Sequence, residues 1–245
     1  MANDPHTPSP PAAPRHAVYA APAPDSPWWQ AGSQWLGRCA ATGSTLEPPE
    51  VPGFTPDELT RLTHEPRRYG WHATLKAPVT LAQGVSPQQW YDRMCTLANQ
   101  CPPLALPPLV VRRLGHFLAL VIDGDDQPVQ ALAAACVTRL HDLAAPLSAS
   151  ELARRRSAGL DARQEALLQQ WGYPHVLDRF RFHFSLTGPL HGLSDAQVDR
   201  LMQAATDWFA PLPPLTLDRL AWFVEPMPGG LFRWEASCPL QGVDA

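Results

Sequence analysis

The stretch RRYGWHATLKAPVTL, residues 67–81, alternates apolar and polar side chains from Trp71 onward. Alternation with a period of two is typical of a β-strand that buries one face. His72 and Thr74 then lie on one face of that strand. The pattern therefore predicts a strand that presents an imidazole and a hydroxyl together.

A second stretch, FRFHFSLTG at residues 180–188, repeats this arrangement with His183 and Ser185. Each half of the chain follows the order strand, helix, strand, strand, with a histidine on the first strand. Such self-similarity predicts an internal duplication. The strands expected from alternation lie at residues 15–21, 71–81 and 180–188, with two more in 107–123 and a hairpin in 215–240.

Helices are expected where a capping residue precedes an amphipathic run. Ser26, Thr55, Ser86 and Ser194 hold this position, and Pro27 suits the first turn of its helix. The helical runs cover residues 24–38, 55–62, 86–100, 127–143, 148–172 and 194–209.

These elements predict an α+β fold with a disordered, Pro-rich tail at residues 1–14 and one bilobal domain over residues 15–245. Within the domain, the first motif lobe is expected at about 15–125, crossover helices at about 126–175 and the second motif lobe at about 176–242.

The composition is that of a soluble globular protein, with 45% hydrophobic and 17% charged residues and no apolar run of 18 or more. The tail lacks the apolar segment of a signal peptide, so we expect a cytoplasmic protein that does not bind membranes. The formal net charge of -4 argues against a broad nucleic-acid surface, but it is compatible with a local site for a small anionic phosphate ester.

The five cysteines are an odd number and show no CxxC spacing. Neither a zinc site nor a disulfide framework is therefore indicated. We expect reduced thiols at Cys39, Cys95, Cys101, Cys136 and Cys238.

The two motifs suit chemistry on a phosphodiester. One imidazole can accept a proton from an attacking water while the other donates one to the leaving oxygen, and the hydroxyls bind non-bridging oxygens. A histidine pKa of about 6.5 permits both roles near neutral pH. The expected catalytic pair is His72 and His183, with no metal and no cofactor. The other candidate histidines lack metal-ligand spacing: His64, His116, His141, His175 and His191.

Three longer stretches carry a family resemblance: RHAVYAAPAPDSPWWQAGSQWLGRCAATG (15–43), RRYGWHATLKAPVTL (67–81) and ELARRRSAGLDARQEALLQQWGYPHVLDRFRFHFSLTGPL (151–190). They resemble the phosphonate metabolism proteins, a branch of the two-histidine (2H) phosphoesterase superfamily often encoded beside carbon–phosphorus lyase genes. The resemblance covers nearly all of residues 15–240. It implies two duplicated lobes, each an antiparallel sheet with helices on its outer face. The motifs would face each other across a cleft between the sheets, with a cyclic phosphodiester as substrate.

The resemblance places the phosphate-binding hydroxyls on Thr74 and Ser185. The family usually has Thr at position 185, Met where this chain has Phe184, and a bulkier aromatic where it has Ala20. Serine keeps the hydroxyl, so we expect phosphate binding to survive. The small residue at position 20 predicts a wider pocket.

Four further residues are candidate substrate contacts. By period two, Lys76 shares the face of the first motif and Arg181 that of the second, so either can attract an anion. The alternatives are a lysine that reaches solvent and an arginine in a surface ion pair. Tyr69 and Tyr19 either line the cleft or belong to the core.

Two other patterns have structural explanations. Trp28, Trp29 and Trp35 stand at helical spacing, which favours a core over a base-stacking surface. The basic run from Arg154 to Arg156 is typical of a solvated helix face.

The leading functional hypothesis is a phosphoric diester hydrolase, a metal-independent cyclic phosphodiesterase that opens a small cyclic phosphodiester. The family resemblance implies a ribose cyclic phosphate from phosphonate degradation as one such substrate. One alternative is processing of 2',3'-cyclic phosphate ends of RNA, including ligase-like activity. That reaction predicts a basic track, which 19 Lys and Arg residues do not indicate. The other alternative is a non-catalytic sensor of phosphate esters, which would not need an acid and a base.

Overall fold

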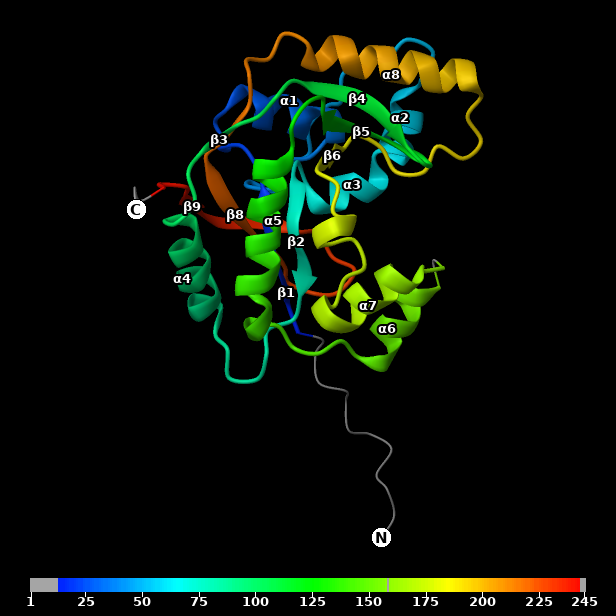
Figure 1. The fold of residues 1–245 in the computed structure, drawn as a ribbon. Coiled ribbons are helices and arrows are strands. Elements are labelled where there is room, and N and C mark those ends of the chain that lie inside the picture. Colours follow the sequence, from blue (N-terminus) through cyan, green and yellow to red (C-terminus); the bar gives the residue numbers. More distant parts are fainter. Residues whose placement is uncertain (1–12, 158, 243–245) are drawn as a thin grey trace.

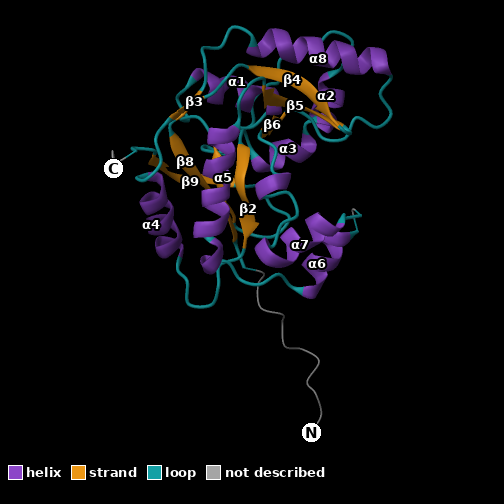
Figure 2. Ribbon diagram, in the orientation of Figure 1, coloured by secondary structure: helices purple, strands orange, loops and turns teal. Residues whose placement is uncertain are grey.

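The computed structural model describes residues 13–157 and 159–242. Residues 1–12 of the tail predicted at 1–14 therefore lie outside the described residues. The described part contains a seven-stranded sheet, a two-stranded sheet and surrounding helices (Figure 1 and Figure 2). The strands are β1 Arg15–Ala20, β2 Ala73–Val79, β3 Leu104–Ala105, β4 Leu109–Leu114, β5 Phe117–Ile122, β6 His183–Ser185, β7 Thr216–Leu217, β8 Arg219–Glu225 and β9 Arg233–Pro239.

The helices begin largely where the capping residues predict. The side chains of Ser26, Thr55, Ser86 and Ser194 each accept a hydrogen bond from the backbone N–H three residues later. The helices are α1 Pro27–Leu36, α2 Pro56–Leu62, α3 His64–Tyr69, α4 Pro87–Ala98, α5 Gln127–Arg139, α6 Ala149–Arg156, α7 Ala162–Trp171 and α8 Asp195–Phe209, with 3-10 turns η1 His141–Leu143 and η2 Leu177–Arg179.

Two helical regions differ from the expectation. The run predicted at 148–172 is two helices, because Asp161 caps a new helix after α6 has ended. The short helix α3, immediately before the first motif, was not predicted. Its N-cap residue, Thr63, makes no side-chain capping hydrogen bond, so the sequence lacks the usual start signal.

The seven-stranded sheet has the order β4-β5-β6-β2-β1-β8-β9, and each neighbouring pair is antiparallel. The α+β class and the antiparallel sheet are therefore confirmed. The two motif strands, β2 and β6, are neighbours in this sheet, where Ala73 pairs with Phe184. β6 therefore joins β5 to β2 within one sheet. The two duplicated lobes and the cleft between their sheets stay a prediction.

Aromatic packing fixes the start of β2. Trp71 is fully buried, and its ring stacks on those of Phe184 and Phe209, with centroids 4.9 and 5.3 Å away. Gly32 of α1 lies against the same ring, since a Cβ there would come within 1.9 Å of it. His72 therefore follows a residue that is held from several sides. The predicted core tryptophans are confirmed: Trp28, Trp29 and Trp35 are 7%, 1% and 3% exposed.

One pair of cysteines corrects the expectation of reduced thiols. Cys95 in α4 and Cys238 in β9 form a disulfide, with their Cα atoms 5.1 Å apart. The packing of α4 against β8 and β9 brings these residues together across a sequence separation of 143. Cysteine spacing along the chain gave no signal of this pairing.

None of the helices in the described ranges is both long enough and apolar enough to cross a membrane.

Candidate functional site

Both motif histidines are oriented by the same local hydrogen bond. The Nδ1–H of His72 donates to the Gly70 carbonyl at 2.9 Å, and that of His183 donates to the Arg181 carbonyl at 2.8 Å. A carbonyl oxygen can only accept, so each Nδ1 carries a proton and each neutral ring keeps a lone pair on Nε2. Nε2 is therefore the nitrogen that each imidazole can offer to a ligand.

Strand pairing sets the two motifs side by side. Ala73 pairs with Phe184 in antiparallel register, so His72 lies opposite Ser185, and the threonine of the first motif lies opposite the histidine of the second. Side chains directly opposite each other have Cβ atoms about 4.5–5.5 Å apart. Each imidazole thus has a hydroxyl of the other motif beside it. The first motif also has its own contact, since the hydroxyl of Thr74 lies 3.2 Å from Nε2 of His72.

Burial keeps the imidazoles in their neutral form. Removal from water lowers the pKa of His72 to about 4. The hydrogen bond to the Gly70 carbonyl acts in the opposite direction, and the nearby charge of His183 lowers the pKa further. Burial also lowers the pKa of His183. At neutral pH the site therefore contains two neutral imidazoles, each of which can accept a hydrogen bond or a proton.

A cavity of about 450 Å³ lies over the first motif and is lined by His72, Thr74 and Ser185. Tyr19 also lines it and stacks on His72, with ring centroids 3.8 Å apart and an angle of 27° between the rings. Tyr69 lines the cavity as well. Both tyrosines thus belong to the cavity wall, and Tyr19 is at the same time fully buried.

A second cavity of about 600 Å³ adjoins the first and is lined by His183 and Arg181. Arg181 is exposed, in line with a place at the edge of this space. The structure therefore brings both histidine motifs to two neighbouring cavities. The residues that line both are Thr74, Ala77, His116, Phe117 and Tyr173.

Lys76, the sole lysine of the sequence, is placed outside the site. It is 3% exposed, and its ammonium donates to the Val137 carbonyl of α5 at 3.3 Å. Regular alternation fails because one step along β1, from Val18 to Tyr19, corresponds to two steps along β2. This bulge turns Ala77 toward the cavities in place of the lysine.

Four arginines line the first cavity, and none was predicted as a site residue. Arg15 and Arg68 both form ion pairs with Glu225, which is completely buried. Arg154 and Arg155 come from α6, in the run expected to be a solvated face. Their place is set by how α6 lies against the sheet, which local sequence patterns do not show.

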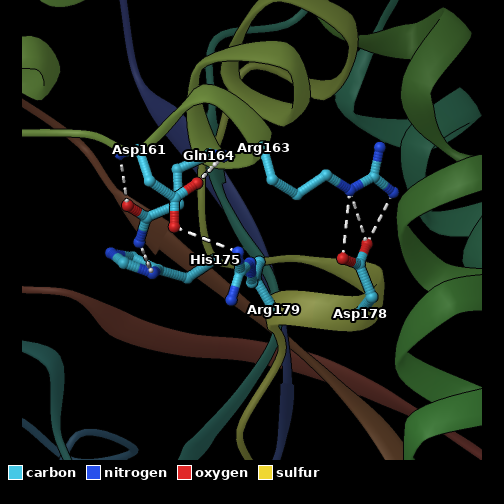
Figure 3. Close-up of polar contacts among 6 residues, drawn as sticks. All are labelled: Asp161, Arg163, Gln164, His175, Asp178 and Arg179. Atoms are coloured by element: carbon cyan, nitrogen blue, oxygen red, sulfur yellow. Dashed lines mark hydrogen bonds and ion pairs between the residues drawn. The ribbon is translucent and has the colours of Figure 1, made fainter.

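Figure 3 shows the polar contacts between the N-terminal part of α7 and the segment that leads into β6. Arg163 binds Asp178 through two nitrogens, at 2.6 and 3.0 Å, and Arg179 binds Asp161 at 3.0 Å. Exposed ion pairs of this kind stabilise a fold only weakly. They do connect α7 to η2, and so help fix the course of the chain past the second cavity to His183.

Within the described residues, no group of three or more His, Cys, Asp or Glu side chains is arranged to hold a metal ion. Two further histidines line the cavities. His175 lines the second cavity, and His116 lines both and stacks on His191 with centroids 6.1 Å apart. Neither was predicted as a lining residue.

Comparison with known proteins identifies the family. Residues 74–233 match the family model described as "Protein of unknown function (DUF1045)". The chain belongs to this family. The matched span contains Thr74, His183 and Ser185 and begins two residues after His72.

Two curated relatives of this DUF1045 chain carry the same name, ribose 1,5-bisphosphate phosphokinase PhnN. The protein from Janthinobacterium sp. (strain Marseille) is 40% identical over 225 residues, which are 90% of this chain and 50% of that protein. The protein from Laribacter hongkongensis (strain HLHK9) is 36% identical over 219 residues, 89% of this chain and 50% of that protein. The chain spans about half the length of the curated relatives it matches.

These names correct the expected enzyme class. Both relatives are named as phosphokinases and neither as a phosphodiesterase, so the classification of this DUF1045 chain as a phosphoric diester hydrolase is wrong. That classification followed from an acid and base pair, which can act on phosphate oxygens in more than one kind of reaction. Membership of the 2H superfamily stays a prediction.

Proposed function

We propose that the two neighbouring cavities lined by His72 and His183 bind the phosphate group of a phosphorylated ribose, and that the histidines exchange protons with its oxygens, as a step in phosphonate metabolism. The observation that carries this proposal is the opposed placement of the motifs. Each Nδ1–H donates to a backbone carbonyl and each Nε2 keeps its lone pair, that of His72 lying 3.2 Å from the Thr74 hydroxyl. The relatives are named for ribose 1,5-bisphosphate, which supports the choice of sugar.

The roles of the four motif residues follow from their chemistry. The hydroxyls of Thr74 and Ser185 donate hydrogen bonds to non-bridging phosphate oxygens. An anion beside a neutral imidazole favours the protonated ring, so the bound phosphate draws a proton onto one histidine. His72 or His183, once protonated, donates to one ester oxygen while the other ring still accepts.

The kinase activity in the relatives' name is not part of this proposal. A phosphate-binding P-loop needs the pattern GxxxxGK[ST], in which the lysine reaches the nucleotide phosphates. The sole lysine of this sequence, Lys76, lies between Leu75 and Ala77, whereas the motif requires Gly before the lysine and Ser or Thr after it. We therefore assign phosphate recognition and proton transfer to this chain, without transfer from a nucleotide.

Calorimetric titration of the purified chain with ribose 5-phosphate tests the proposal. We expect His72→Ala and His183→Ala each to weaken binding about tenfold or more, because each loses a charge-assisted hydrogen bond. His64→Ala is the matched control, since His64 is exposed and lines neither cavity. Unchanged affinity in both site variants would refute the proposal.

Phosphorus NMR of the same proteins decides what happens to a bound ester. The substrates are a ribose cyclic phosphate and a short RNA ending in a 2',3'-cyclic phosphate. Ring opening that depends on both histidines would indicate cyclic phosphodiester hydrolysis, and a change confined to the RNA would indicate RNA-end processing. Binding without change would indicate a sensor.

A further inference from the structure

The three consecutive arginines that end α6 differ in what they contact. Arg156 points to α7 and binds the Glu165 carboxylate through two nitrogens, at 2.6 and 3.1 Å. Arg154 and Arg155 instead line the cavity of about 450 Å³ that contains His72. One basic run therefore supplies both a surface ion pair and two cations at the site.

Local structure leaves the two cavity arginines available. Glu151, one turn earlier in α6, uses its carboxylate to complete the helix cap, accepting from the backbone N–H of Ser148 at 3.0 Å and its hydroxyl at 2.8 Å. In the part of the chain that the structure describes, the guanidinium groups of Arg154 and Arg155 form no hydrogen bond or ion pair, and Nε of Arg155 is buried without a partner. A buried donor without a partner is costly, so an acceptor is expected there.

Aromatic contact sets the position of Arg155. Its guanidinium lies 5.1 Å from the ring centroid of Tyr173, which also lines the cavity. A cation held over an aromatic face keeps its N–H groups directed sideways, where a planar acceptor can bind them. Arg155 is thus oriented without being neutralised.

The sheet side of the same cavity is also positive. Arg15 and Arg68 share the single carboxylate of Glu225, so one of the two positive charges is not balanced by that ion pair. Glu65 is the one acidic residue among the described residues that line this cavity. Four arginines against these two carboxylates leave an excess of positive charge, which favours a ligand with more than one negative group.

The arginines and the first histidine motif belong to different elements of the cavity wall. Arg154 and Arg155 belong to α6, whereas His72 immediately precedes β2. A phosphate on the motif residues and a second anion on the arginines of α6 would therefore contact different elements of one cavity.

We propose that Arg154 and Arg155, together with Arg15 and Arg68, form a second anion subsite, and that the ligand is a sugar with two phosphate groups. One phosphate binds His72, Thr74 and Ser185, and the other binds the arginines of α6. This inference rests on the proposed function, because it assigns the first phosphate to the histidine motifs.

Calorimetric titration of the full chain with ribose 5-phosphate and with ribose 1,5-bisphosphate tests the subsite. We expect the parent to bind the bisphosphate at least tenfold more tightly than the monophosphate. Arg155→Met and Arg154→Met are expected to remove most of that difference while changing monophosphate affinity less than threefold. Arg156→Met is the matched control and should leave both affinities unchanged, because Arg156 lies outside the cavity. Thermal unfolding of each variant checks that the fold is kept.

The outcomes separate this inference from the proposed function. Equal affinities of the parent for the two ligands, with binding still lost in His72→Ala, would overturn the second subsite and leave the proposed function standing. An equal loss of bisphosphate affinity in Arg156→Met would also overturn it, since the effect would then be one of overall charge. No binding of either ligand by the parent would overturn both.

Discussion

His72 immediately precedes β2, and the antiparallel pairing of Ala73 with Phe184 sets it opposite Ser185 at the end of β6, so each histidine motif has the hydroxyl of the other motif beside its imidazole. A phosphate in this position would meet groups from two strands that are more than a hundred residues apart in sequence. The arrangement makes the site sensitive to small changes in how β2 and β6 pair. It also makes the protonation state of His72 part of ligand binding.

Phosphate binding is expected to take up a proton. Burial holds the pKa of free His72 at about 4, and an adjacent anion raises it. The bound-state pKa is then above the free one, so affinity should strengthen as pH falls from about 7 toward 5 and weaken as pH rises through the bound-state pKa. Titration of ribose 5-phosphate in two buffers of different ionisation enthalpy measures the uptake. Equal heats in both buffers would contradict this, and His72→Ala should lack the uptake.

Gly70 is expected to be indispensable for the first motif. Its φ is +81°, and an added Cβ would lie 2.5 Å from that of Ala40, while its carbonyl orients His72. Gly70→Ala should lower the free energy of unfolding by about 2–4 kcal/mol and weaken ribose 5-phosphate binding. Gly84→Ala is the matched control, because Gly84 has a φ of +83° but no atom within 4 Å of an added Cβ. Similar stability and affinity losses in both variants, measured by urea unfolding and calorimetry, would argue against this role.

Local patterns were sufficient for the existence of the motif strands and for most helix starts, but not for strand length, because β2 begins after His72 and β6 covers His183–Ser185 of the predicted 180–188. The alternation around His72 and His183 and the capping residue Ser86 depend on residues close in sequence, and such patterns carry through to the structure. The same reasoning failed at Lys76, because a β-bulge is a property of two paired strands and not of one. The two-residue period correctly predicted that Thr74 shares the cavity with His72, but it wrongly predicted the same for Lys76.

Long-range placement set the limit of prediction for the rest of the site. Arg155 is over eighty residues from His72 in sequence, and nothing within α6 distinguishes it from Arg156, which faces outward. The joining of both motif strands into one sheet likewise depends on where β6 pairs. These relationships required the three-dimensional structure.

Lys76 is expected to affect stability and not binding. Burial lowers its pKa to about 8 from 10.5, so the folded protein releases this proton at lower pH than the unfolded chain does. The cost of burying the charge is present below about pH 8 and is relieved as pH rises toward 10.5, a change of about 3 kcal/mol. Lys76→Met should lack this rise in unfolding free energy relative to the parent, and its affinity for ribose 5-phosphate should stay within twofold. A large loss of affinity would instead show that Lys76 contributes to ligand binding.

The disulfide between Cys95 and Cys238 is expected to hold α4 against the last strand of the sheet. It closes a loop with a sequence separation of 143, and a crosslink of this kind reduces the entropy of the unfolded chain. Replacing both cysteines by alanine should lower the free energy of unfolding by about 2–4 kcal/mol, measured by urea unfolding without reductant. Cys101→Ala, at a free and half-buried thiol, is the control and should change it little.

A thiol count gives an independent check on that crosslink. In the denatured, unreduced protein, an alkylating reagent should label Cys39, Cys101 and Cys136, the cysteines that are free in the structure. Labelling of Cys95 and Cys238 without reductant would show that the bond is absent in the isolated protein. In that case the double alanine variant should unfold like the parent, because no crosslink would have been removed from either state.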